Sequence, residues 1–329
     1  MTAAEADLVR ELLELNRARP EMTLAQRREL YERADAAFAD LDGDGDAADP
    51  AAQLVAVGQA TALWAHRAAD SRPTVLYLHG GSYTMGSPRS HRHLAKEVGI
   101  QAAASVLVLD YRRPPEHPFP AAVDDAMAAY HHLREQGVPA ERIALAGDSA
   151  GSGLALALLQ RLRELAEPLP AAAACLSPWT DLSCGFSSHD TLAERDPVLR
   201  TDDLRAMGRL YLGGADPHTP LASPAFADLA GLPPLLVQVG TEEILLDDAV
   251  VLADRARAAG VPVEFELWPG MFHVWHYYFP LLSEGREAIA SIGRFIAAHA
   301  GGGAAVAVTA PSTSIPSPRS AGRRDHAGP

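Results

Sequence analysis

A serine that could act as a nucleophile stands in the stretch Gly147-Asp148-Ser149-Ala150-Gly151, between the apolar run IALA and the Ala/Leu-rich run SGLALALL. The pattern G-x-S-x-G between a strand and a helix is typical of a nucleophile elbow, which holds the hydroxyl above a sheet at the positive end of a helix. Larger neighbours would collide with the strand or the helix. A phosphate loop needs Gly-Lys-Ser/Thr and a dinucleotide site needs G-x-G-x-x-G, and the glycines at 147, 151 and 153 fit neither. The stretch therefore predicts a reactive serine.

A second loop of small residues could stabilise negative charge. His79, Gly80, Gly81 and Ser82 follow the apolar run TVLYL (74–78). Consecutive small residues allow backbone N–H groups to point into a cavity, where two of them and the N–H of Ala150 could bind the oxygen that becomes negative on an attacked carbonyl. Losing one such donor typically costs about 2.7–4 kcal/mol of transition-state stabilisation. The loop predicts an oxyanion hole.

The general base is expected after the last strand, because an elbow serine is followed along the chain first by the acid and then by the histidine. The stretch ELWPGMFHVW (266–275) indicates a strand and a Pro-Gly turn, and His273 comes just after the turn. We predict His273 as the base, with His276 as an alternative. Four other histidines lie in predicted helices, where solvation or packing explains them more simply: His91, His93, His131 and His132.

The acid is expected after the preceding strand, in the stretch QVGTEEILLDDA (238–249). A carboxylate there could hold the outer nitrogen of the histidine and stabilise the imidazolium. Asp247 and Asp248 more plausibly begin the next helix, since carboxylates favour a helix N-terminus. The chemistry alone leaves Glu242 and Glu243 both open.

The elements around these residues predict a parallel α/β sheet. Five short, almost continuously apolar runs suit strands that are buried on both faces: 74–80, 105–111, 142–148, 172–178 and 235–241. Helical patterns alternate with them, and two early strands precede them at 53–58 and 60–66. Helical spacing at 4–40 predicts two N-terminal helices. Residues 184–232 contain no strong core strand and form an insertion that could cover the site.

Composition excludes several functions. The chain of 329 residues carries 28 basic and 42 acidic side chains, a formal charge of −14, so we expect no nucleic-acid or anionic membrane partner. Its two cysteines indicate a reducing compartment, and neither a signal peptide nor a membrane-spanning run is found. We expect a soluble, cytoplasmic protein without a metal or organic cofactor. The Asp-Gly repeat at 41–50 lacks the final glutamate of a calcium loop.

The chain resembles the bacterial hormone-sensitive-lipase-like esterases of the α/β-hydrolase fold. Four blocks match in order: HGGSYTMGS, DYRRPPEHPFPAAVDDA, GDSAGSGLAL and GTEEILLDD with GMFH. The resemblance implies Ser149, Glu243 and His273 as the triad, and Gly81, Ser82 and Ala150 as oxyanion donors. It also implies N-terminal cap helices at 1–45, a catalytic domain at 50–299 with the cap insertion at 184–232, and a disordered tail at 300–329.

Three positions depart from the family pattern. Ser82 replaces the third glycine of H-G-G-G, Glu243 replaces the usual aspartate, and YRRPPE (111–116) replaces the more usual YRLAPE. HGGSY and EILLDD are similar to the acetyl-hydrolase type that includes bialaphos deacetylases. The resemblance implies a small short-acyl ester as substrate, and a homodimer is compatible with it. Alternatives are N-deacetylation or lactone opening by the same triad, and a ligand-binding receptor, as in the plant gibberellin receptors that resemble this family without a working triad.

Overall fold

One sheet of eight strands forms the centre of the computed structural model, which describes residues 9, 13, 22–41, 54–69 and 72–301. The spatial order is β1-β2-β4-β3-β5-β6-β7-β8. β2 runs antiparallel to β1 and β4, and every other neighbouring pair is parallel. The strands are β1 (Leu54–Val57), β2 (Ala60–His66), β3 (Thr74–Leu78), β4 (Ser105–Asp110), β5 (Ile143–Asp148), β6 (Ala172–Leu176), β7 (Leu235–Gly240) and β8 (Val263–Trp268).

The apolar runs explain the parallel strands. Every residue of β3, β5, β6 and β7 is buried, as continuous apolar sequence predicts for strands covered on both faces. β8 contains only half-buried and exposed residues and lies at the edge of the sheet. The predicted α/β-hydrolase architecture, with a mostly parallel sheet flanked by helices, is confirmed.

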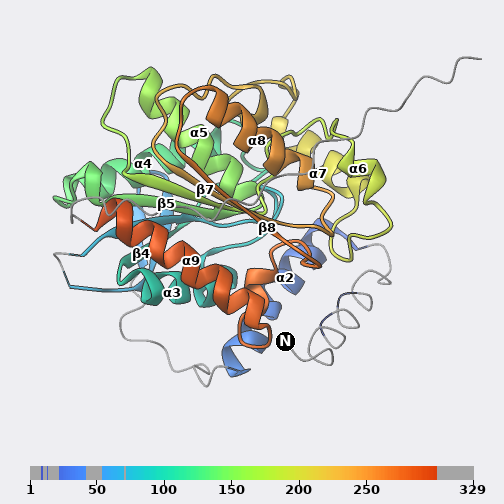
Figure 1. Cartoon of the computed structure of the whole chain (residues 1–329), viewed down its shortest axis with the longest axis horizontal. Helices are drawn as coiled ribbons and strands as arrows, with labels where there is room; N and C mark the ends of the chain where they lie inside the picture. Colours follow the sequence, from blue (N-terminus) through green and yellow to red (C-terminus); the bar gives the residue numbers. More distant parts are fainter. Residues whose placement is uncertain (1–8, 10–12, 14–21, 42–53, 70–71, 302–329) are drawn as a thin grey trace, which may run out of the picture.

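Helices cover both faces of the sheet (Figure 1). α3 and α9 pack on one face around a cluster that includes Leu94 and Ile292, while α4, α5 and α8 pack on the other around Leu154 and Leu252. Their bounds are α3 (Pro88–Ala102), α4 (Ala121–Glu135), α5 (Ala150–Glu164), α8 (Leu246–Ala258) and α9 (Ser283–Ala300), with short 3₁₀ helices η1 (Ala140–Arg142) and η3 (Trp275–Tyr278).

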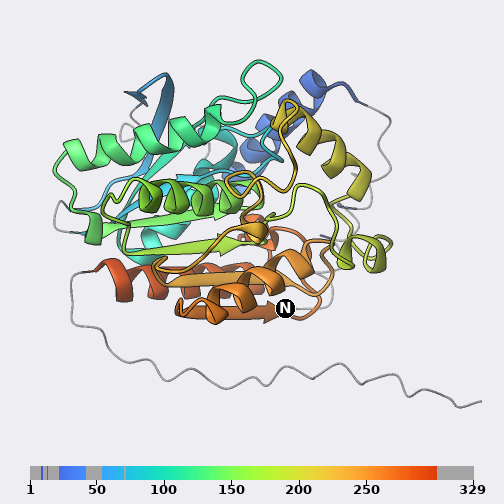
Figure 2. The same cartoon turned by 90° about the horizontal axis from the view of Figure 1, so that it is seen from above.

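The expected cap segments lie beside one another. The insertion between β6 and β7 holds α6 (Ser188–Thr191), α7 (Thr201–Leu212) and η2 (Pro224–Phe226). The N-terminal α2 (Leu24–Leu41) lies next to α7 in Figure 2, and Arg27 on α2 forms an ion pair with Asp203 on α7 at 3.2 Å. Three parts of the predicted organisation lie outside the described residues: most of the cap before residue 22, the Asp-Gly repeat after Leu41, and the tail from 302 onwards.

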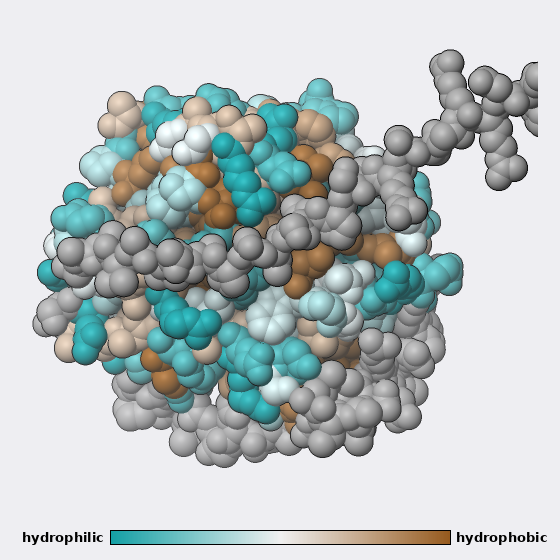
Figure 3. Space-filling model, viewed as in Figure 1, coloured by the Kyte–Doolittle hydropathy of each residue, from teal (hydrophilic) through white to brown (hydrophobic). Residues whose placement is uncertain are grey.

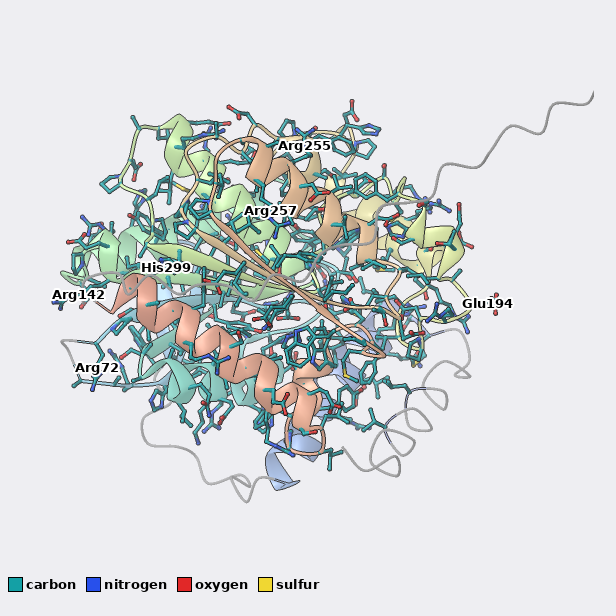
Figure 4. The ribbon with its side chains drawn as sticks, in the orientation of Figure 1. Arg72, Arg142, Glu194, Arg255, Arg257 and His299 are labelled. Atoms are coloured by element: carbon teal, nitrogen blue, oxygen red, sulfur yellow. The ribbon has the colours of Figure 1, made fainter. Side chains whose placement is uncertain are left out.

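The insertion between β6 and β7 lies beyond the carboxyl ends of the parallel strands. Arg72 and Arg142 precede β3 and β5 and project at the left edge in Figure 4, whereas Glu194 of the insertion projects at the right edge. The face shown in Figure 3 intersperses hydrophilic and hydrophobic residues where grey atoms do not cover it. No helix of the described part is long and apolar enough to cross a membrane.

Candidate active site

Ser149 has the backbone conformation expected of a nucleophile elbow. It lies between the end of β5 and the first residue of α5, with φ of 53° and ψ of −119°. The glycines permit this turn, because a Cβ on Gly151 would lie 1.9 Å from Leu78 O, and one on Gly147 would lie 2.6 Å from the Gly151 carbonyl. A strained non-glycine residue of this kind costs about 1–3 kcal/mol and persists only where the surroundings determine it. The serine hydroxyl is thereby held at the N-terminus of α5.

Glu243 and His273 form the acid–base contact of the site. His273 Nδ1 lies 2.9 Å from Glu243 Oε2, and both side chains are buried. An ionised carboxylate only accepts hydrogen bonds, so the ring proton lies on Nδ1 and leaves Nε2 as the basic nitrogen. Glu242 points elsewhere and forms an ion pair with Arg195. The structure thus gives the histidine contact to Glu243 rather than Glu242.

The three predicted triad residues all lie at the carboxyl ends of the parallel strands. Ser149 follows β5, Glu243 follows β7 and His273 follows β8, and these strands are parallel. Among the described residues, no hydrogen bond joins the Ser149 hydroxyl to His273 in this state. Such contacts often tighten only when substrate is bound. The acid–base half of the predicted triad is therefore formed, and the serine–histidine half is not.

His276, the alternative base, is engaged in another way. Its Nε2 lies 2.8 Å from Gln238 Oε1, while the Gln238 amide donates to Glu266 at 2.7 Å. Because that amide must donate to the carboxylate, Gln238 Oε1 accepts and the His276 proton lies on Nε2. Burial lowers the pKa of His276 to about 3. His276 is a neutral, packed residue.

Ser177 belongs to the site although the sequence did not single it out. It follows β6, between the strands that precede Ser149 and Glu243. Its hydroxyl donates to Glu243 Oε1 at 2.8 Å and accepts the amide of Val274 at 3.1 Å. The amide of Gly240 donates to the same carboxylate oxygen at 2.6 Å. Ser177 therefore fixes the Glu243 carboxylate and the backbone next to His273. The only signal was a small polar residue directly after a buried strand.

The loop at residues 79–86, the oxyanion loop, has an unusual backbone. Gly81, Ser82 and Tyr83 all have positive φ, of 105°, 51° and 59°. Within the described part of the chain, the N–H groups of Gly81, Ser82 and Ala150 donate to no acceptor. Buried N–H groups are nearly always paired, so three unpaired ones indicate a place for an external acceptor. The left-handed conformation of Ser82, where glycine is usual, costs about 1–2 kcal/mol.

Asp148 connects the elbow to the oxyanion loop. Its carboxylate accepts from Tyr77 Oη at 2.9 Å and from Gly80 N at 3.1 Å, and it lies 3.4 Å from His91 Nε2. Although burial opposes ionisation, His91 and these hydrogen bonds hold the pKa of Asp148 below its usual value. His79 Nδ1 donates to Gly80 O at 2.8 Å, and burial keeps the pKa of His79 well below its usual value. The predicted helical packing of His91 is confirmed, but its contact with Asp148 is new.

Asp196, in the cap insertion, is a second buried carboxylate beside the acid. It accepts the amides of Val198, Leu199 and Ile244, at 2.8, 2.8 and 2.9 Å. Burial raises the pKa of Asp196, and the nearby imidazole of His273 and the three amides oppose that shift. The sequence gave no indication of this residue, because nothing local connects residue 196 with residue 273.

Side chains of α7 pack against the oxyanion loop. Leu204 and Tyr211 on α7 are buried, and the Tyr211 ring stacks on Tyr83 with centroids 3.8 Å apart. Met207 Sδ accepts from Thr84 Oγ1 at 3.3 Å. One face of α7 therefore rests on the oxyanion loop.

Asp247 and Asp248 lie in the first turn of α8, as predicted. Asp247 accepts the amide of Ser188, at 2.9 Å, and Asp248 accepts the amide of Thr180 at 2.8 Å and faces His189 at 3.2 Å. These carboxylates attach the start of the insertion to the sheet next to Glu243.

Known proteins resemble this chain over most of its length. A family model described as the alpha/beta hydrolase fold matches residues 75–277. An acetyl-hydrolase of Streptomyces hygroscopicus is 55% identical over 303 residues, 92% of this chain and 99% of that protein. An esterase of Acinetobacter venetianus is 36% identical over 69% of this chain and 75% of its own. A crystal structure of an esterase from the bacterial hormone-sensitive lipase family matches with a TM-score of 0.83 and 44% identity, covering 91% and 99% of the two chains.

Proposed function

Because this chain belongs to the hormone-sensitive-lipase family of α/β-hydrolase-fold esterases, we propose that it hydrolyses short-acyl carboxylic esters through Ser149, His273 and Glu243. The observation that carries the proposal is the buried contact between His273 Nδ1 and Glu243 Oε2, beside a serine in the elbow conformation. The Ser149–His273 hydrogen bond is expected to form when substrate is bound, as catalytic contacts often tighten only then.

In the first step, His273 Nε2 takes the proton of the Ser149 hydroxyl as the oxygen attacks the ester carbonyl. Nδ1–H continues to donate to Glu243, whose negative charge stabilises the imidazolium. The carbonyl oxygen becomes negative and accepts the N–H groups of Gly81, Ser82 and Ala150. Donors held by the backbone of the loop and the elbow would need little reorganisation as the charge develops.

In the second step, the tetrahedral intermediate collapses and the alcohol leaves with the proton from His273. Ser149 then carries the acyl group as an ester. A water molecule loses its proton to His273 and attacks this ester, and the acid product leaves as the serine regains its proton. Apart from this water, each step uses only groups of the chain and the substrate.

Acetyl is the acyl group that we propose first, because the relative at 55% identity is named an acetyl-hydrolase. The same observation supports an N-acetyl amide as a second substrate class, with the amine as leaving group. Lactones would use the same steps, with the leaving alcohol tethered to the acyl group.

A panel of p-nitrophenyl esters from acetate to octanoate tests the proposal, together with N-acetyl amides and lactones. Turnover should be highest with the shortest acyl chains and should disappear in Ser149→Ala. Tight ligand binding without turnover would instead support a receptor.

Two neighbouring glutamates supply a matched comparison for the acid. Glu243→Gln should lower kcat by about 10³- to 10⁴-fold, by analogy with other triads, because an amide no longer stabilises the imidazolium. Glu242→Gln removes only the ion pair with Arg195 and should change kcat by less than about twofold. A larger loss from Glu242→Gln would overturn the assignment of the acid.

A further inference from the structure

Two arginines hold carbonyl groups of the oxyanion loop from outside the site. Arg28 on α2 donates from Nε to Thr84 O at 2.8 Å, and Arg113 donates from Nη1 to Gly86 O. We propose that Arg28 and Arg113 form a clamp that maintains the left-handed backbone of Ser82 and Tyr83, and that both are positioning residues for the oxyanion donors. The inference rests on the proposed function of this loop.

The loop needs external support because its internal backbone hydrogen bonds share a single acceptor, the carbonyl oxygen of Gly81. The amides of Thr84 and Met85 both donate to Gly81 O, at 3.0 and 2.8 Å. Two consecutive residues with side chains, Ser82 and Tyr83, stand in the left-handed region between them. Strain of this kind persists only where surrounding contacts over-determine the conformation. The carbonyls of Thr84 and Gly86 are the points at which the arginines supply such contacts.

Each guanidinium is itself fixed in place. Arg28 also donates to Pro114 O at 2.6 Å and pairs with Glu116 through both Nη atoms, at 3.0 and 3.1 Å. Arg113 forms an ion pair with Asp110, with Nη1 2.9 Å from the carboxylate. The several donors of a planar guanidinium allow one side chain to connect a carboxylate with a backbone carbonyl, which neither leucine nor a single ammonium reproduces.

Both arginines line a cavity of about 330 Å³ together with Asp110, Tyr111 and Glu116. Since the two guanidiniums contact carbonyls of the oxyanion loop, this cavity borders that loop. The clamp therefore connects three segments: α2, the oxyanion loop and the stretch after β4.

The sequence supports the pairing of strain and clamp. Ser82 stands where the resembling family has its third glycine, and Arg113 stands where the usual YRLAPE has leucine. Glycine adopts a positive φ without strain. A chain with glycine at this position has less need of an added contact at the far end of the loop. The two departures are therefore expected to depend on each other.

A double-mutant cycle on Ser82→Gly and Arg113→Leu tests this dependence. Arg113→Leu should lower kcat for p-nitrophenyl acetate about tenfold with little change in KM, because the strain is then relieved by movement of the donors. Amide hydrogen exchange at residues 81–86 should become faster in the same variant. In the Ser82→Gly background, Arg113→Leu should change kcat by less than about twofold relative to Ser82→Gly alone, because glycine holds the positive φ without the clamp.

Arg27→Gln is the matched control, because Arg27 is the neighbouring residue on α2 and pairs with Asp203 rather than with the loop. It should change neither kcat nor exchange at 81–86, whereas Arg28→Gln should change both. If Arg113→Leu does not fold, Arg113→Lys retains the charge beside Asp110 and enters the same cycle.

The outcomes separate the clamp from the proposed function. A loss of kcat in Arg113→Leu that is equally large in the Ser82→Gly background, or unchanged exchange in both Arg28→Gln and Arg113→Leu, would overturn the clamp. Faster exchange with unchanged kcat would support the clamp and overturn the assignment of this loop as the oxyanion hole.

Discussion

Replacing Ser177 by alanine tests whether the acid is positioned by the residue after β6. The change removes a hydrogen bond to a carboxylate and leaves the buried Val274 amide without its acceptor. A hydrogen bond to a charged group contributes about 1.5–3 kcal/mol, and an orphaned buried donor costs about 1–3 kcal/mol. Because both effects arise from one hydroxyl, we expect the free energy of unfolding to fall by about 2–4 kcal/mol. Glu243 retains Gly240 N and His273, so we expect kcat to fall about tenfold, or about 1.4 kcal/mol, with KM unchanged.

Ser223→Ala is the control for Ser177→Ala. Ser223 is also fully buried, donates to one acceptor, Pro217 O at 2.6 Å, and accepts one amide, that of Leu182 at 2.9 Å. Urea unfolding should show similar losses of stability for the two variants, and initial rates with p-nitrophenyl acetate should fall only for Ser177→Ala. Equal stability losses with full kcat in both variants would refute the reasoning.

Three further changes test particular contacts. His276→Gln should remove a pH dependence of stability: the folded state keeps this ring neutral, so its contribution is present above about pH 6.5 and is lost toward pH 3, with a slope approaching about 1.4 kcal/mol per pH unit in urea titrations. Asp148→Asn should destabilise the protein at pH 7, and the difference from the unmodified chain should narrow below about pH 4, because a carboxyl with a lowered pKa loses its contribution in acid. Gly151→Ala should lower the free energy of unfolding by about 1–3 kcal/mol or more through overpacking against Leu78 O, and a thermal melt should show a lower melting temperature.

Local sequence predicted the sheet because a parallel strand that is buried on both faces has an almost continuous run of apolar residues. The apolar runs at 74–78 and 235–240 needed no knowledge of their neighbours. The elbow was also predictable, because its glycines are required by close backbone contacts within one strand–helix unit and with the adjacent strand. The same holds for Asp247 and Asp248, which begin a helix.

Contacts between distant segments were not predictable in this way. Ser177 resembles any serine in a turn until β6 is placed between β5 and β7. The proximity of Asp196 to Glu243 can be recognised only once the insertion has folded back so that Asp196 accepts the amide of Ile244. Chemistry left Glu242 and Glu243 open because both are glutamates after the same strand, and only the backbone geometry of the turn decides which one faces His273. Two carboxylates one residue apart point in different directions, and sequence spacing does not encode that direction.

The position of β8 has a consequence for how catalytic competence arises. β8 is the last strand in the chain, lies at the edge and pairs with β7 alone among the described strands. The other seven strands can pair, with Ser149 and Glu243 at their places, before His273 is positioned. His273 follows β8, so it reaches its place only when β8 has paired with β7. Recovery of turnover during refolding should therefore lag behind recovery of secondary structure, so that enzyme activity reports the docking of the final strand rather than the collapse of the core.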